Sequence, residues 1–230
     1  MKALLRRADR ALLRLIYPEG VLCAACGRAS HGERLCGVCA EELKRLEDAE
    51  LMGTEGVTAV HVWRYAGAAA ALVHQLKFDA SGAAAAVLSE GMAARARGLQ
   101  LPQDTLVTWV PMPRSRSRER WVDHARMLAE ATARQIQLPC AGLLERTRDI
   151  RTQRGLDRAQ RLENVKNGFA ARTAIDHPVL LIDDVLTTGA TAQACCEALT
   201  AAGAARVVVL TATRVLRDAD KDGRSDDSDV

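Results

Sequence analysis

A short apolar run near the end of the chain, residues 179–185, reads VLLIDDV and ends in two adjacent acids before its final valine. The run is too short for a helix, and it lacks the alternation of apolar and polar residues seen in a half-buried strand. A short continuous apolar run is typical of a parallel strand buried on both faces. A Thr/Gly turn (187–191), a helical stretch (192–202) and a second apolar run (206–213) follow it. This order predicts an open α/β sheet that binds a ligand at the carboxyl end of the first strand.

The turn after the acids contains groups that bind a phosphate monoester. A tight turn that opens a helix brings hydroxyls, backbone N–H groups and the positive helix end together. The residues that would do this are Thr187, Thr188, Gly189, Ala190 and Thr191. The adjacent carboxylates of Asp183 and Asp184 suit the neighbouring hydroxyls of a ribose, so the residues predict a ribose 5-phosphate ligand. The alternative is an ordinary turn of a core sheet, which has no use for two adjacent carboxylates.

Two other phosphate-binding motifs are absent from the sequence. It contains neither G-x-x-x-x-G-K-[ST] nor G-x-G-x-x-G, so a P-loop and a dinucleotide-binding fingerprint are both excluded. The phosphate site predicted here therefore depends on the Thr/Gly turn and needs no lysine.

Four of the seven cysteines follow the pattern C-x2-C-x9-C-x2-C: Cys23, Cys26, Cys36 and Cys39. Each pair places two thiolates on one tight turn, which supplies two corners of a tetrahedral zinc ion, and we expect Gly27 and Gly37 to ease the two turns. Four thiolates fill the coordination shell, so the predicted Zn2+ is structural rather than catalytic. Disulfides are the alternative, but they do not persist in a reducing compartment.

The positive charge of the chain is concentrated in one stretch. The net charge is +3, and residues 218–230 contain six Asp against one Lys and one Arg, a net of −4, so the rest of the chain carries +7. Residues 114–172 contain 13 Arg and one Lys against seven acids, which is again +7. This concentration suits pyrophosphate or a nucleic-acid backbone, and the alternative is a solvated face with excess arginine.

The sequence divides into three predicted parts. Residues 1–52 form an N-terminal helix and zinc-binding module, residues 53–217 form the α/β domain, and the acidic tail 218–230 is too polar to fold alone. A Gly-containing linker is expected at 51–56. A membrane-spanning helix needs about 18 consecutive apolar residues, and no apolar run in the sequence approaches that length. Arginines interrupt the N-terminal segment where a signal peptide must be apolar, so we expect a cytoplasmic protein.

Residues 181–191, LIDDVLTTGAT, resemble the phosphoribosyl pyrophosphate (PRPP) signature of type I phosphoribosyltransferases. Further features resemble the ComF family of competence-associated proteins, also called the GntX type. These are the double cysteine knuckle, the segment from Trp63 to Phe78, Val110-Pro-Met-Pro113 followed by arginines, and Gln-x2-Leu-x4-Arg-x2-Asn at 153–164. The resemblance covers nearly the whole chain, from about residue 15 to 215.

The resemblance implies a fold, cofactors and residue roles. The fold would be a type I phosphoribosyltransferase-like parallel sheet flanked by helices. Asp183 and Asp184 would hold the ribose 2- and 3-hydroxyls of PRPP, directly or through Mg2+, and residues 187–191 would cradle its 5-phosphate. The pyrophosphate would meet arginines of the turn after strand 105–110 and of a flexible loop at 146–164: Arg114, Arg116, Arg146, Arg154 and Arg161. Lys77 is a further phosphate candidate, and a solvated surface lysine is the alternative.

Two functions of different classes follow from these expectations. The first is Mg2+-dependent transfer of phosphoribose from PRPP to an acceptor, in DNA uptake, natural transformation or nucleotide metabolism. The alternative is binding of PRPP or single-stranded DNA without turnover. The family usually has Arg-Gly-Phe-Asn-Gln after the pyrophosphate turn, whereas residues 120–124 read RWVDH. An acid at 123 would repel pyrophosphate, so binding is a firmer expectation than catalysis.

Overall fold

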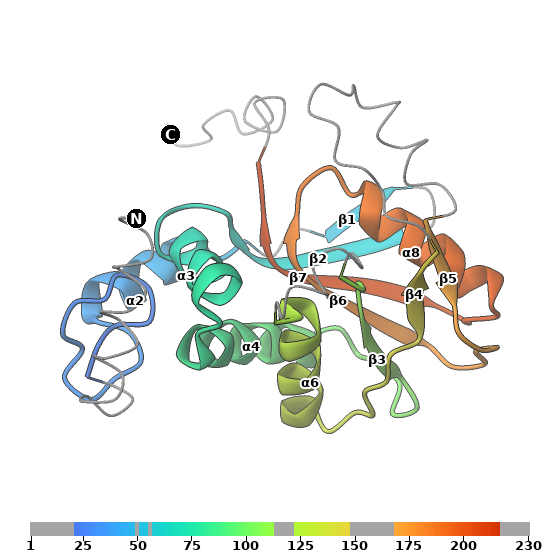
Figure 1. Cartoon of the computed structure of the whole chain (residues 1–230), viewed down its shortest axis with the longest axis horizontal. Coiled ribbons are helices and arrows are strands. Elements are labelled where there is room, and N and C mark those ends of the chain that lie inside the picture. The colour runs from blue at the N-terminus through green and yellow to red at the C-terminus, as the bar shows by residue number, and fades with distance from the viewer. Residues whose placement is uncertain (1–20, 49–50, 55–56, 113–121, 148–167, 217–230) are drawn as a thin grey trace, which may run out of the picture.

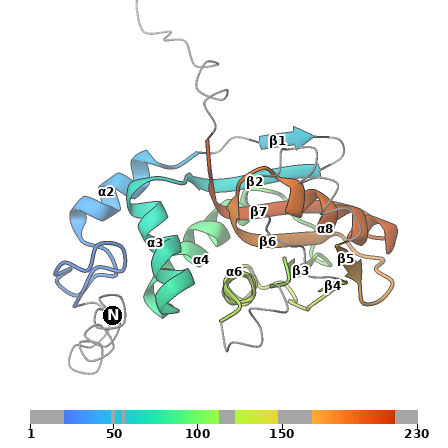
Figure 2. The ribbon, with the colours of Figure 1, turned by 45° about the horizontal axis from the view of Figure 1, so that its top comes forward.

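The computed structural model describes residues 21–48, 51–54, 57–112, 122–147 and 168–216 (Figure 1). A five-stranded sheet with strand order β1-β2-β7-β6-β3 forms its centre, as Figure 2 shows. The strands are β1 (Leu51–Thr54), β2 (Val57–Arg64), β3 (Leu106–Trp109), β6 (Val179–Leu186) and β7 (Val207–Arg214). β1 pairs with β2 antiparallel, and the other four strands are parallel to one another. The expected α/β class with a parallel sheet is confirmed.

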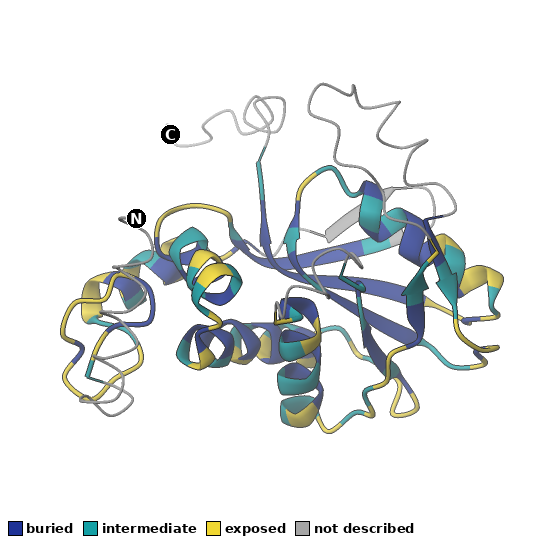
Figure 3. Cartoon of the chain, in the orientation of Figure 1, coloured by how far each residue is buried: buried dark blue, intermediate teal, exposed yellow. Residues whose placement is uncertain are grey.

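Helices and a small second sheet cover the two faces of this sheet. Helices α3 (Gly67–Asp79), α4 (Gly82–Arg97) and α6 (His124–Ile136) pack on one face. Helix α8 (Ala190–Ala201) packs on the other, together with the antiparallel pair β4 (Leu144–Arg146) and β5 (Phe169–Ala171). The central strands are buried between these layers (Figure 3).

Strand β6 shows why a continuous apolar run is needed at the centre of the sheet. Leu180 and Ile182 pack with the helices α3, α4 and α6, whereas Val179 and Leu181 pack on the side of α8. Successive side chains of a strand point to opposite faces, so a strand covered on both sides needs apolar residues at every position. Leu180, Leu181 and Ile182 are all fully buried.

The cysteine-containing segment packs directly on the α/β core. Helix α2 (Gly37–Arg45) follows the second cysteine pair and packs against α3. The chain then runs antiparallel to the end of β2, where the Asp48 N–H donates to the Val62 carbonyl at 2.9 Å and the Arg64 N–H donates to the Leu46 carbonyl at 2.9 Å. Buried residues of the segment, including Cys23 and Leu43, belong to the same apolar cluster as the sheet and helices.

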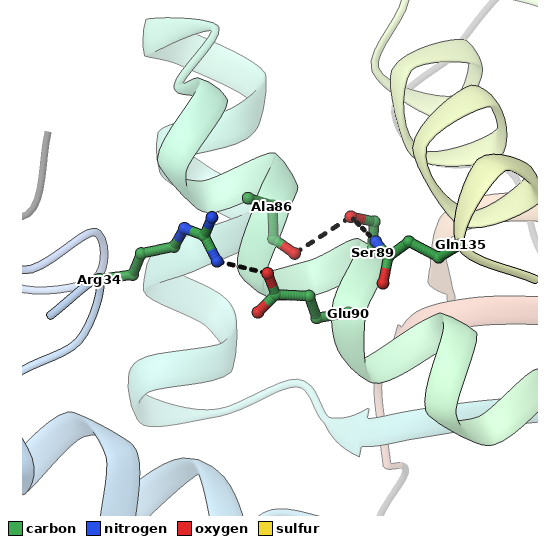
Figure 4. Close-up of polar contacts among 5 residues, drawn as sticks. All are labelled: Arg34, Ala86, Ser89, Glu90 and Gln135. Atoms are coloured by element: carbon green, nitrogen blue, oxygen red, sulfur yellow. Dashed lines mark hydrogen bonds and ion pairs between the residues drawn. The ribbon is translucent and has the colours of Figure 1, made fainter.

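Helix α4 links the cysteine segment to α6 (Figure 4). Arg34, from the loop between the cysteine pairs, forms an ion pair with Glu90 of α4. One residue earlier on α4, the Ser89 hydroxyl donates to the Ala86 carbonyl at 3.0 Å and accepts from the Gln135 amide of α6 at 3.1 Å. The helix is therefore held by polar contacts on two sides.

The strands expected at 105–110, 179–185 and 206–213 and the helix expected at 192–202 are present as β3, β6, β7 and α8, whereas β1, β4 and β5 differ from the expectations. The linker expected at 51–56 was wrong for residues 51–54, which form β1 because the outer edge of β2 needs a partner for its backbone groups. This strand spans the proposed domain boundary between residues 52 and 53. The strands β4 and β5 were not expected. None of the described helices combines the length and apolarity needed to cross a membrane.

Candidate functional site

Asp183 and Asp184 lie at the carboxyl end of β6 but on opposite faces of the sheet. The alternation of the strand places Asp183 on the side of Leu181 and helix α8, and Asp184 on the side of Ile182 and helix α3. An ion pair between Asp184 and Lys77 of α3 agrees with this placement. The two carboxylates therefore flank the strand end, so that a ligand bound across the edge of the sheet would meet one on each side.

Asp183 has an unusual electrostatic environment. Burial and the neighbouring charge of Asp184 raise the pKa of the Asp183 carboxyl to about 7, although the Asp184 N–H and the charges of Lys77 and Arg146 oppose the shift. The Asp184 N–H donates to Asp183 Oδ1 at 2.9 Å. Carboxyl groups with strongly raised pKa values are common at functional sites, so Asp183 is a candidate functional residue. A cation or hydroxyl donor bound beside it would stabilise the charged form of the carboxylate.

Lys77 brings a positive charge to the other carboxylate. It lies in the last turn of α3, and its Nζ is 2.9 Å from Asp184 Oδ1. The sequence suggests a phosphate contact for this lysine, with a solvated surface lysine as the alternative, but it does not indicate Asp184 as the partner. The two residues are far apart in the sequence, and no local pattern brings the end of α3 to the end of β6.

The Thr/Gly turn opens helix α8 as the phosphate prediction requires. Gly189 has a φ of +80°, and a Cβ built on it would contact no other atom within 4 Å, so the space beside the turn is open. The Thr188 Oγ1 accepts a hydrogen bond from the Ala190 N–H at 3.3 Å, which satisfies one of the free N–H groups at the helix start. Thr187 is exposed, and Thr191 is partly exposed.

One of the five predicted pyrophosphate arginines lies in the described part of the chain. Arg146 of β4 donates from Nε to the Pro111 carbonyl at 2.8 Å, so it lies at the carboxyl end of β3. Its guanidinium is 4.8 Å from the centre of the Phe169 ring. The positions of Arg114, Arg116, Arg154 and Arg161 lie outside the described residues.

Asp123, the acid that departs from the family pattern, caps a helix. It is the residue before α6, and its Oδ1 accepts a hydrogen bond from the Arg126 N–H at 3.1 Å. Burial raises the pKa of its carboxyl, and the hydrogen bond from the Arg126 backbone opposes that shift. This contact gives Asp123 a structural role that an Asn at the same position could also fill, because Asp and Asn are both favoured helix N-caps.

The four patterned cysteines come together as a candidate metal centre. The sulfur atoms of Cys23, Cys26, Cys36 and Cys39 all lie within 4.8 Å of one another. Cys26 Sγ and Cys36 Sγ are 3.7 Å apart. A tetrahedral zinc with Zn–S bonds of about 2.3 Å requires sulfur–sulfur distances of about 3.8 Å, so the donor set fits a single ion.

The two cysteine pairs are positioned by different local structures. The first forms a turn in which Gly27 has a φ of +73° and donates its N–H to the Cys23 carbonyl at 2.9 Å. The second lies at the start of α2, where Cys36 is the N-cap, so the sequence expectation that Gly37 eases a second tight turn was wrong. Gly37 is simply the first residue of the helix.

The thiols differ in how readily they lose a proton. Burial alone would raise the pKa of the Cys26 thiol, but hydrogen bonds from the Arg28 side chain and backbone and from neighbouring thiols lower it to about 6. Arg28 Nε lies 3.4 Å from Cys26 Sγ. Burial and hydrogen bonds with the other thiols raise the pKa of Cys39. Cys26 is therefore better prepared than Cys39 to bind a metal as thiolate.

No protein-family model matches the chain. Among solved structures, the allosteric regulatory enzyme of purine biosynthesis is 23% identical, with a TM-score of 0.38 over 55% of this chain and 25% of that one. Adenine phosphoribosyltransferase from Leishmania tarentolae is 14% identical, with a TM-score of 0.38 over 74% of this chain and 98% of that one. TM-scores this low support no conclusion about activity.

Sequence relatives are more informative. The chain is 28% identical to competence protein F of Haemophilus influenzae over 187 residues, 74% of this chain and 80% of that protein. It is 31% identical to DNA utilization protein YhgH of Escherichia coli K12 over 207 residues, 86% of each chain. The chain therefore belongs to the family of DNA utilization protein YhgH and competence protein F, the ComF family that its motifs resemble.

Proposed function

We propose that the chain binds PRPP with Mg2+ at the carboxyl end of β6 and transfers the phosphoribosyl group of PRPP to an acceptor. We propose DNA uptake or utilization as the biological setting. The observation that carries the proposal of PRPP binding is the Thr/Gly turn, which follows the strand of Asp183 and Asp184, opens helix α8 and leaves open space beside Gly189. The names of the relatives, DNA utilization protein and competence protein, support the biological setting.

The residues present suit such a ligand. Backbone N–H groups at the start of α8 and the threonine hydroxyls would bind the 5-phosphate, which the positive helix end also favours. Asp183 and Asp184 offer oxygen donors, the type that Mg2+ prefers, and they would accept hydrogen bonds from the ribose hydroxyls. When bound, Mg2+ would neutralise charge on the leaving pyrophosphate. Arg146 would add positive charge on the Asp183 side of the strand end.

We also propose that the four cysteines bind one structural Zn2+. Four thiolates close the coordination shell and leave no position for a substrate. The ion would fix a segment whose own buried residues are few and are shared with the main core. In this proposal the zinc has no part in phosphoribosyl transfer.

A second candidate function is binding of single-stranded DNA without turnover. The observation that favours it is the net charge of +7 in residues 114–172, from 13 Arg and one Lys against seven acids. A protein that neutralises DNA phosphates binds more weakly as salt rises, because bound counterions are released. An affinity for single-stranded DNA that does not change with salt would contradict this function.

Calorimetry with PRPP and Mg2+ tests the primary proposal. We expect the wild-type protein to bind and Asp183→Asn to bind at least about tenfold more weakly, because a charged hydrogen-bond partner is lost. Asp176→Asn is the matched control, since this acid is 92% exposed and precedes the amino end of β6. No binding by the wild-type protein, or equal binding by the three proteins, would contradict the proposal. Release of pyrophosphate in the presence of candidate acceptors tests transfer separately.

A further inference from the structure

The ion pair between Lys77 and Asp184 occupies part of the site proposed for the cation and the ribose. Lys77 Nζ lies 2.9 Å from Asp184 Oδ1, the side chain of Asp184 is 11% exposed and that of Lys77 is 34% exposed. The Asp184 side chain is therefore largely covered, and the Lys77 side chain is the more exposed of the two. A ligand that reaches Asp184 from solvent has to share it with Lys77 or replace Lys77.

The position of Lys77 on α3 requires an explanation beyond helix stability. A cation in the last turn of a helix is favoured by the helix dipole, but the dipole alone would keep the ammonium near the carbonyl groups of its own helix. The adjacent Leu76 is fully buried and anchors this turn against the core. From that fixed turn the lysine reaches a carboxylate on a different element, at the end of the central strand.

Charge balance explains what this contact does. Two adjacent carboxylates at the end of one strand repel each other, and Lys77 supplies a positive charge in direct contact with one of them. Removing the ammonium group alone is costly, because it leaves the largely covered carboxylate of Asp184 without a compensating charge. Lys77 can leave Asp184 at low cost only when another cation takes its place and an anion receives the ammonium group.

Mg2+ and a phosphate ester together meet both conditions. We infer that Lys77 is an exchangeable counter-cation, which neutralises Asp184 in the ligand-free site and moves to a phosphate of the ligand when Mg2+ binds at Asp184. This inference rests on the proposed function and adds a ligand-binding residue to it. The flexible four-carbon stem of lysine, with three ammonium donors, suits such a change of partner.

The inference predicts effects of opposite sign on the two ligands. Lys77→Met keeps the length and apolar stem of the side chain and removes its charge. We expect this variant to bind Mg2+ alone about three- to tenfold more tightly than the wild-type protein, because no ammonium competes for Asp184. We expect it to bind PRPP in the presence of Mg2+ about ten- to 150-fold more weakly, because a charged donor to phosphate is lost.

Three comparisons complete the experiment. Lys77→Arg keeps the charge and should retain most of the PRPP affinity. Lys44→Met is the matched control: Lys44 pairs with Glu41 at 2.9 Å on α2, where both side chains are more than half exposed. Its affinities should equal those of the wild-type protein. Thermal melting of each variant separates a loss of binding from a loss of folding.

The possible results separate this inference from the proposed function. If the wild-type protein binds PRPP but Lys77→Met changes neither affinity, or weakens both to the same extent, Lys77 is not an exchangeable counter-cation and the proposed function stands. If a folded wild-type protein binds neither Mg2+ nor PRPP, the proposed function and this inference both fail. Opposite changes in Lys77→Met, with an unchanged Lys44→Met, would support the inference.

Discussion

At the scale of single residues, Gly189 is the position where backbone and ligand requirements coincide. Its φ of +80° lies in the left-handed region, and the space beside it is open. A side chain at this position is therefore strained by the backbone rather than by a neighbouring atom. The same side chain would enter the space that we propose for the phosphate.

We expect Gly189→Val to lose both stability and affinity. The left-handed conformation should reduce the free energy of unfolding by about 1–2 kcal/mol, and PRPP binding should fall more than in Thr191→Val. Thr191→Val is nearly isosteric and removes one hydroxyl donor, which should weaken binding about ten- to 150-fold with little change in stability. Denaturant melts and calorimetry measure the two quantities. Normal PRPP binding by Gly189→Val would place the phosphate elsewhere.

The raised pKa of Asp183 has a consequence for stability against pH. The pKa is about 7 in the folded protein, against about 3.9 for an aspartate in an unfolded chain, so between these values the folded state holds a proton that the unfolded state releases. The stability that this carboxyl contributes is complete below about pH 4 and is lost as the pH rises through about 7.

Asp183→Asn should remove this dependence. Relative to the wild-type protein, the variant should become more stable by roughly 1 kcal/mol for each pH unit between pH 5 and 7, and the difference should level off above that range. Urea unfolding at several pH values without added Mg2+ measures it. Parallel stability curves for the two proteins would show that the pKa of Asp183 is not raised.

At the scale of elements, position 123, which departs from the family pattern, caps the start of helix α6. Asp123 accepts a hydrogen bond from the Arg126 N–H, so its acid serves the helix. Asp123→Ala should reduce the free energy of unfolding by about 0.5–2 kcal/mol, whereas Asp123→Asn should leave it nearly unchanged, because Asn caps helices as well as Asp does. Denaturant unfolding distinguishes the two variants. Equal destabilisation by both would mean that the negative charge, rather than the cap, stabilises the protein.

The cysteine segment behaves as an element of the core. Cys23 and Cys39 are buried in the same cluster as the helices α3 and α4. We expect one zinc per chain, and its removal by a strong chelator should lower the melting temperature by more than about 5 °C, because the binding energy of a structural metal is folding energy. Metal analysis measures the number of zinc ions per chain, and differential scanning calorimetry measures the melting temperature. Four freely titrating thiols in an untreated, folded protein would contradict the zinc proposal.

At the scale of the whole molecule, the features that the sequence predicts are those determined by residues close together in the chain. The strand β6, the turn after it and helix α8 follow from adjacent residues, because hydrophobic period and turn chemistry are properties of a short segment. The cysteine cluster was also predictable, since two C-x2-C pairs leave few other arrangements.

What the sequence did not predict depends on contacts between distant segments. Strands β4 and β5 have three residues each, and their pairing of Leu144 with Ala171 joins segments far apart in the chain. The contact of Lys77 with Asp184 has the same origin. The placement of the two acids on opposite faces follows from strand alternation once β6 is known to be covered on both sides.

Hydrogen–deuterium exchange with and without PRPP and Mg2+ tests the central claim most directly, because it reports on the ligand at each segment of the native chain. A ligand bound at the carboxyl end of β6 should slow exchange of the amides in residues 187–191, whose N–H groups would bind the phosphate. Exchange in helix α2 should change little. Bound PRPP that leaves 187–191 unprotected would contradict the site proposed for this protein.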